Sequence, residues 1–97
     1  MKVVFFIEKE NTNKIKDIVN QDPIGRQSIT FRDNIALGLE KEGNYLLIDG
    51  MEEACKEAQE KLKDLAEELE GEEKEEVITK MKELEESAMS GFGGIFG

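Results

Sequence analysis

The stretch KVVFFIE, residues 2–8, is the clearest structural signal of the sequence, because its five central residues are all apolar and both its ends are charged. Valine, isoleucine and phenylalanine are the residues that favour β-structure. A run without polar alternation is typical of a strand that is covered on both faces. The stretch therefore predicts a buried central strand. It is also too short to form the apolar region of a secretory signal or to span a bilayer.

The residues that follow the central strand predict a helix and then more strands. NTNKIKDIVNQDP (11–23) has helical apolar spacing and ends at a proline, which predicts a helix of two to three turns. QSITFRD (27–33) and NIALGLE (34–40) alternate apolar and polar residues, as half-buried strands do. Asp33-Asn34 between them would form a hairpin turn. YLLID (45–49) completes a meander and a sheet of about four strands.

The second half of the chain changes to helical spacing. Asp49 and Glu52 fit a capping box, and Gly71 is expected to end or interrupt the helix that they start. A second helix is expected over residues 72–90, joined to the first by a short turn, and a single bent helix is the alternative. The first helix carries an apolar seam with alternating spacings of four and three residues: Met51, Cys55, Ala58, Leu62, Leu65 and Leu69.

These elements predict one α+β domain over residues 1–90, in the order β-α-β-β-β-α-α with two C-terminal helices, and a Gly/Phe-rich tail over 91–97. Neither this tail nor Ser90 before it, together SGFGGIFG, contains a charged side chain. Phe92, Ile95 and Phe96 would share one face of a helix, but the glycines make an isolated helix costly. We expect a frayed end, packing onto the domain itself, or an apolar motif for a partner groove.

Charge restricts the possible partners. The net charge is −10, of which residues 51–97 carry −9. A negative field of this size disfavours nucleic acid and anionic membranes, and it permits basic proteins or divalent cations. The chain has no histidine and one cysteine, which excludes imidazole-based catalysis, thiolate clusters and a disulfide within the monomer. One thiol and no signal-like start indicate a cytoplasmic protein.

The predicted seam is a candidate partner surface. A helix over residues 51–69 would be longer than the strands, so that Leu62, Leu65 and Leu69 would extend beyond the sheet. The following helix could fold back to cover them, a second copy of the chain or another protein could supply the covering helix, or the helices could be partly mobile.

A second hypothesis is Ca²⁺ or Mg²⁺ binding at Asp49, Glu52 and Glu53, where the last predicted strand meets the helix. The structural alternative is that these acids complement the dipole at the helix N-terminus. The Glu-rich stretch over residues 67–76 is also more typical of a solvated face than of a site. No EF-hand spacing is present.

Catalytic patterns are sparse. Nucleotide-binding glycine motifs and the nucleophile-elbow motif are absent from the sequence. Cys55 lies on the apolar seam, as a buried small hydrophobe would. Arg26 and Arg32 could anchor an anion in a small enzyme, but are more simply surface residues. We therefore expect no enzyme and no obligatory cofactor.

KEAQEKLKDLAEELEGEEKEE (56–76) and the start MKVVFFIEKE resemble, in style, small uncharacterised proteins of archaeal, methanogen-like type. The resemblance implies no functional residue. The sequence as a whole predicts a non-catalytic interaction or oligomerisation module, with the seam and the residues Phe92, Ile95 and Phe96 as contacts, and divalent-cation binding as the alternative.

Overall fold

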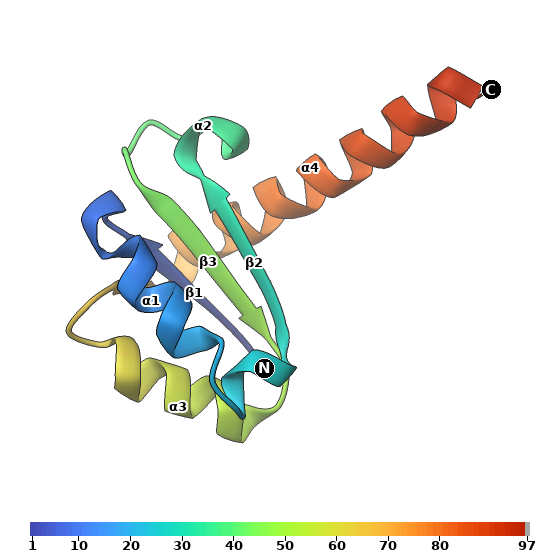
Figure 1. Cartoon of the computed structure of the whole chain (residues 1–97). Helices are drawn as coiled ribbons and strands as arrows, with labels where there is room; N and C mark the ends of the chain where they lie inside the picture. The colour runs from blue at the N-terminus through green and yellow to red at the C-terminus, as the bar shows by residue number, and fades with distance from the viewer. Residues whose placement is uncertain (97) are drawn as a thin grey trace.

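A four-stranded antiparallel sheet with helices on both faces forms the body of the protein (Figure 1). The computed structural model describes the backbone of residues 1–96 and the side chains of residues 1–86. The strand order is β2-β3-β1-β4. Because every strand pair is antiparallel and helices pack on the sheet, the class is α+β, as predicted. The elements are β1 (Lys2–Ile7), α1 (Thr12–Val19), β2 (Ser28–Asp33), α2 (Asn34–Leu37), β3 (Asn44–Asp49), α3 (Glu52–Leu62), β4 (Glu67–Leu69) and α4 (Gly71–Phe96), with short 3-10 turns at Lys9–Asn11 and Ile24–Arg26.

β1 is the buried central strand that its apolar run predicts. It pairs antiparallel with β3, where Phe5 lies opposite Leu46, and with β4, where Val4 lies opposite Leu69. Its alternate side chains point into two separate cores, because successive residues of a strand face opposite sides. The sheet consequently needs a helical layer on each face.

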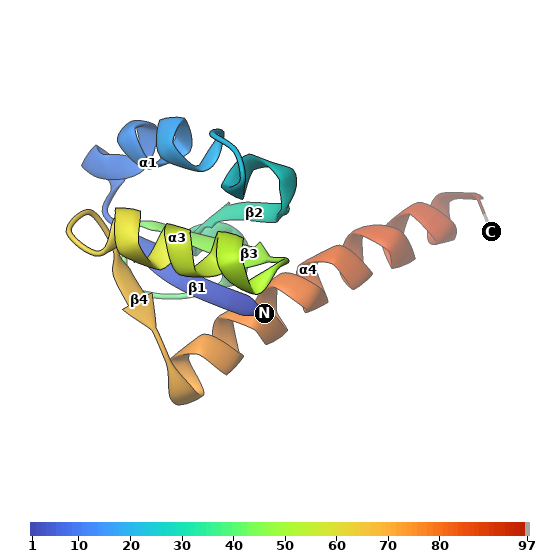
Figure 2. The same cartoon turned by 90° about the horizontal axis from the view of Figure 1, so that it is seen from below.

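The first face of the sheet is covered by α1 and α3. Figure 2 shows these helices on the side of the strands opposite α4. The core on this face contains buried residues from β1, α1, β3 and α3 and from the turn before β2: Val3, Phe5, Ile7, Ile15, Val19, Ile24, Leu46, Ile48, Cys55, Ala58 and Leu62.

The second face of the sheet is covered by the first half of α4 and by α2. Its core contains Val4, Phe6, Leu37, Tyr45, Leu69, Val77 and Met81, with Leu39, Leu47, Ile78 and Leu84 partly buried beside them. This second core has fewer buried residues than the first. It includes Tyr45, whose ring packs edge-on against Phe6 with 5.3 Å between the ring centroids.

The strand predicted over residues 34–40 is wrong, and so is the hairpin turn at Asp33-Asn34. Residues 34–37 form the one-turn helix α2, in which an Asp33 carboxylate oxygen accepts a hydrogen bond of 2.7 Å from the Ala36 N–H. Gly38 ends this turn in the left-handed conformation at φ 71°. The Asp33 cap and the left-handed Gly38 fix this turn, and Ile35, an apolar position of the predicted strand, is left 79% exposed.

The helix predicted over residues 51–69 ends at Leu62. After a loop the chain forms β4, which supplies hydrogen-bond partners to the free side of β1, a requirement that local spacing does not reveal. The capping box is also wrong, because Met51 is the N-cap and no side chain caps α3. Gly71, at φ 61°, begins α4 and does not end a helix, so neither a two-helix turn nor one bent helix describes the segment.

α4 confirms the second predicted helix and continues further. Its backbone is helical as far as Phe96, through the segment predicted as a separate tail. The side chains of Phe92, Ile95 and Phe96 lie outside the described residues. Within the part of the chain that the structure describes, no helix combines the length and the apolar character needed to cross a membrane.

Candidate functional site

The predicted leucine seam is not an exposed surface. Leu62 is fully buried in the first core, Leu65 packs against that core, and Leu69 is buried in the second core. The expected overhang does not exist, because α3 ends at Leu62. The domain itself covers all three leucines, and Met51 at the start of the seam is exposed.

The overhanging element is α4. Figures 1 and 2 both show it leaving the body as a single rod, and in Figure 1 it passes behind β3 and β2 and continues beyond β2. The helix gives the molecule a longest dimension of 45 Å against 28 and 26 Å for the other two. Residues 71–86 of α4 include seven acidic and three basic side chains, whereas residues 87–96 include no charged one.

β2 forms an open edge of the sheet. Among the residues whose backbone the structure describes, no strand pairs with its outer side. Asn34, just after β2, donates its backbone N–H to the Gly43 carbonyl at 2.9 Å. Backbone groups of successive residues point to alternate sides of a strand, so those of Ile29 and Phe31 point away from β3.

The side chain of Arg32 confirms this direction. Its Nη1 donates a hydrogen bond of 2.7 Å to the Phe31 carbonyl oxygen, which a carbonyl facing β3 would not accept. The guanidinium therefore occupies one of the free acceptors of the open edge. Ile29 and Phe31 themselves are half-buried beside the first core, and Lys16 Nζ lies 5.6 Å from the centroid of the Phe31 ring.

A groove of about 330 Å³ runs along α4 on the second face, next to this edge. α4 contacts α2, which follows the C-terminal end of β2, and the groove lies on the other side of α4, over the N-terminal half of β2. Both apolar and charged side chains line it: Lys2, Ser28, Thr30, Leu47, Asp49, Ile78, Met81, Lys82 and Glu85.

Two further hollows lie at the opposite end of the strands, where charged side chains gather. In the first, of about 340 Å³, Lys41 Nζ lies 4.1 Å from the Phe6 ring centroid and 3.2 Å from a Glu67 carboxylate oxygen. Glu8 lines the same hollow, and its pKa is raised by the hydrogen bond and the charge of Glu10.

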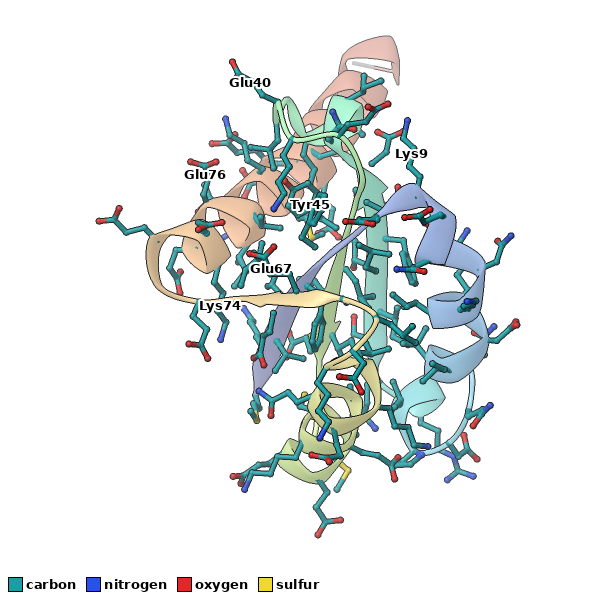
Figure 3. All side chains as sticks on the ribbon, turned by 90° about the vertical axis from the view of Figure 1, so that its left-hand side faces the viewer. Lys9, Glu40, Tyr45, Glu67, Lys74 and Glu76 are labelled. Atoms are coloured by element: carbon teal, nitrogen blue, oxygen red, sulfur yellow. The ribbon has the colours of Figure 1, made fainter. Side chains whose placement is uncertain are left out.

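The second hollow, of about 440 Å³, lies beside Tyr45. Burial raises the pKa of the Tyr45 hydroxyl, an effect that the nearby Lys41 opposes. Figure 3 shows Tyr45, Glu67 and Glu76 on this side of the molecule. Two residues of the Glu-rich stretch over 67–76 contact the body of the protein. Glu67 pairs with Lys41, and Glu68 accepts a hydrogen bond of 2.8 Å from Gln59.

The residues proposed to bind a cation lie at the junction of β3 and α3. Glu52 and Glu53 occupy the first turn of α3, and Glu52 forms an ion pair of 3.0 Å with Lys56. That hydrogen-bonded lysine lowers the pKa of Glu52. Within residues 1–86 no group of three or more acidic or cysteine side chains could hold a metal ion. The cation hypothesis at Asp49, Glu52 and Glu53 therefore gains no support from the described residues.

The remaining candidates already have partners within the chain. Arg26 pairs with Asp22 at 3.2 Å, and Arg32 is bonded to the Phe31 carbonyl, so the two arginines do not converge on one anion position. Cys55 is buried, with Sγ 3.5 Å from the Met1 carbonyl oxygen. The sequence identified β2 as a strand, but the strand order that leaves its edge open has no local signal.

Comparisons with known protein families, with curated proteins and with solved structures find no match.

Proposed function

We propose that this protein is a non-catalytic interaction module whose docking element is the projecting part of α4. The observation that carries the proposal is the course of α4 beyond the β2 edge (Figure 1), where the sheet of its own chain ends. Most helical stability in proteins comes from tertiary packing, and this supports a partner for a helix whose backbone runs beyond the sheet of its own chain.

The composition of α4 supports the same proposal. Its first half has a charged outer surface and buries Val77 and Met81 against the sheet, as a helix on a single domain does. Residues 87–96 have no charge although the chain as a whole carries −10. Cores of protein interfaces are depleted in charged residues, so this composition fits a segment that another protein covers.

The solvent exposure of the charged side chains in the hollow near Phe6 supports a non-catalytic role. Glu8, Lys41, Asp64 and Glu67 around the hollow near Phe6 are all exposed. Catalytic acids and bases generally need a desolvated environment to shift their pKa toward neutrality. We also propose a reducing compartment such as the cytoplasm, supported by the single buried thiol of Cys55.

Photo-crosslinking tests the docking element. A benzophenone amino acid in place of Phe92, in cells that naturally make the protein, is expected to form a covalent adduct of defined mass. The matched control places the same amino acid at Lys56, which is exposed on α3 away from α4. Equal adduct yields at the two positions, or no adduct at either, would contradict the proposal.

A further inference from the structure

We propose that the partner is a second copy of this chain, which pairs antiparallel with the open edge of β2 and places its own α4 in the groove over Ser28 and Thr30. This inference rests on the proposed function and names its partner. It follows from the backbone of β2, from the residues along β2, and from the position of the groove.

The backbone of β2 is suited to accept another strand. β2 has six residues, none of them proline, and Ile29, Phe31 and Asp33 direct their N–H and C=O groups to the open side. Exposed edges of this length promote strand pairing unless they are blocked. The only block among the described side chains is the hydrogen bond from Arg32 to the Phe31 carbonyl, and an N–H of the added strand replaces that hydrogen bond.

The sequence of β2 is complementary to itself in one register. A two-fold axis perpendicular to the sheet lies between the two strands, level with one residue that faces its own copy. It cannot lie between two residues, because side chains opposite each other have to share a face of the sheet. An axis at Thr30 sets Ile29 opposite the partner's Phe31, and Phe31 opposite the partner's Ile29, which extends the first core across the interface. Both residues are already half-buried against that core.

The neighbouring registers are poorer. An axis at Phe31 would set Ile29 opposite the partner's Asp33, an apolar residue against a charge. An axis at Ile29 would pair only residues 28–30 of β2 and would set Phe31 opposite the partner's Gln27, which lies outside the strand. With the axis at Thr30, Ser28 lies opposite the partner's Arg32 and no like charges meet.

The same axis brings the second α4 to the groove. Each α4 contacts its own α2, which follows the C-terminal end of β2, and passes behind β2 (Figure 1). Rotation about Thr30 carries the partner's helix to the N-terminal half, which is where Ser28, Thr30 and Leu47 line the groove. The two helices then lie side by side and antiparallel on the second face, with Met81 and Ile78 of the first helix along their contact.

The length of the projecting segment matches this arrangement. Glu85 still lines the groove of its own chain, so residues 87–96 extend beyond it. Ten helical residues span about 15 Å, which is the width of about three strands at 4.8 Å spacing. The segment is therefore long enough to cover the second face of the partner as far as its central strand.

A symmetric disulfide tests the register. In the proposed pairing Thr30 and the partner's Thr30 form a non-hydrogen-bonded pair, with Cα atoms about 4.5 Å apart, within disulfide range. The full-length Thr30→Cys variant, oxidised in dilute solution, is expected to run mainly as a covalent dimer. Native Cys55 is buried and gives little background.

The matched control is Ser28→Cys, on the same strand and the same face. Its thiol would lie about 14 Å along the strand from the partner's, so it should stay monomeric under the same oxidation. Equal crosslinking of the two variants, or none in either, would overturn the proposed interface.

Failure of this inference can be separated from failure of the proposed function. An adduct of Phe92 with a different protein, together with a monomeric Thr30→Cys variant, would contradict the second copy as the partner and retain α4 as the docking element. A Thr30→Cys dimer that is unchanged after deletion of residues 87–97 would retain the β2 interface and contradict the role of α4.

Discussion

The two edges of the sheet solve the problem of free backbone groups in opposite ways. β4, at one edge, is three residues long, includes Glu67 and Glu68, and is joined to the body by Lys41 and Gln59. β2, at the other edge, is six residues long, and one of its outward carbonyl groups, that of Phe31, accepts a hydrogen bond from the Arg32 side chain. Short edges made mostly of charged residues resist further pairing, and longer edges with few charges promote it. The difference supports the proposal that β2 is the edge at which a second copy pairs.

The protected edge should be the more costly one to disturb. Leu69 is 4% exposed and joins β4 to the second core, so Leu69→Ala is expected to lower the free energy of unfolding by about 3 kcal/mol. Chemical denaturation measures the change. Ile35→Ala, at a residue 79% exposed, is the control and should be nearly silent. An equal loss in the two variants would show that Leu69 is not buried as described.

The C-terminal limit of the open edge depends on the Asp33 cap. Asp33→Ala removes the hydrogen bond to the Ala36 N–H and should cost about 1 kcal/mol of stability. Asp33→Asn retains an accepting oxygen and should recover most of this loss. Thermal unfolding distinguishes the two variants. If both were as stable as the natural chain, the capping role of Asp33 would be disproved.

The open edge should respond to charge at its centre. Thr30→Lys places two lysines opposite each other on the proposed axis, which should weaken self-association by about two- to fivefold. Ser28→Glu, which would face the partner's Arg32, should not weaken it. Sedimentation velocity over a concentration series measures both variants. A stronger effect of Ser28→Glu than of Thr30→Lys would move the axis away from Thr30.

The smallest expected effect lies between the two edges, at Tyr45. Burial raises the pKa of its hydroxyl above the value of an unfolded chain, so the folded state holds the proton more tightly. Stability should therefore be unaffected below the unfolded pKa and should fall as the pH rises through it toward the folded pKa. Urea unfolding across that alkaline range measures the loss, and Tyr45→Phe should remove this component. An identical pH profile in the variant would contradict the assignment.

The sequence was sufficient for elements whose stability is local or whose composition is extreme. The apolar run of β1, the apolar-polar alternation of β2 and the amphipathic spacing of α1 each specify one structure. It was insufficient where tertiary pairing decides. Leu62, Leu65 and Leu69 have the spacing of one helix, yet β4 forms because β1 needs a partner on its second side. A Glu-Glu-Leu strand has little propensity of its own to reveal this.

The candidate surface was misplaced for the same reason. The seam was predicted from a helix extending to Leu69, and ending that helix at Leu62 returns all three leucines to the core. The helix that extends beyond the sheet is α4 and not α3. The openness of β2 depends on strand order, which is a property of the whole sheet and is not encoded in residues 28–33 alone.

Sedimentation equilibrium of the full-length chain shows whether two copies pair in solution. The monomer mass is 11.0 kDa. We expect the weight-average mass to rise toward twice that value as the protein concentration increases, and to return toward 11.0 kDa on dilution. A mass that stays at 11.0 kDa up to millimolar concentration would contradict pairing of two copies at β2.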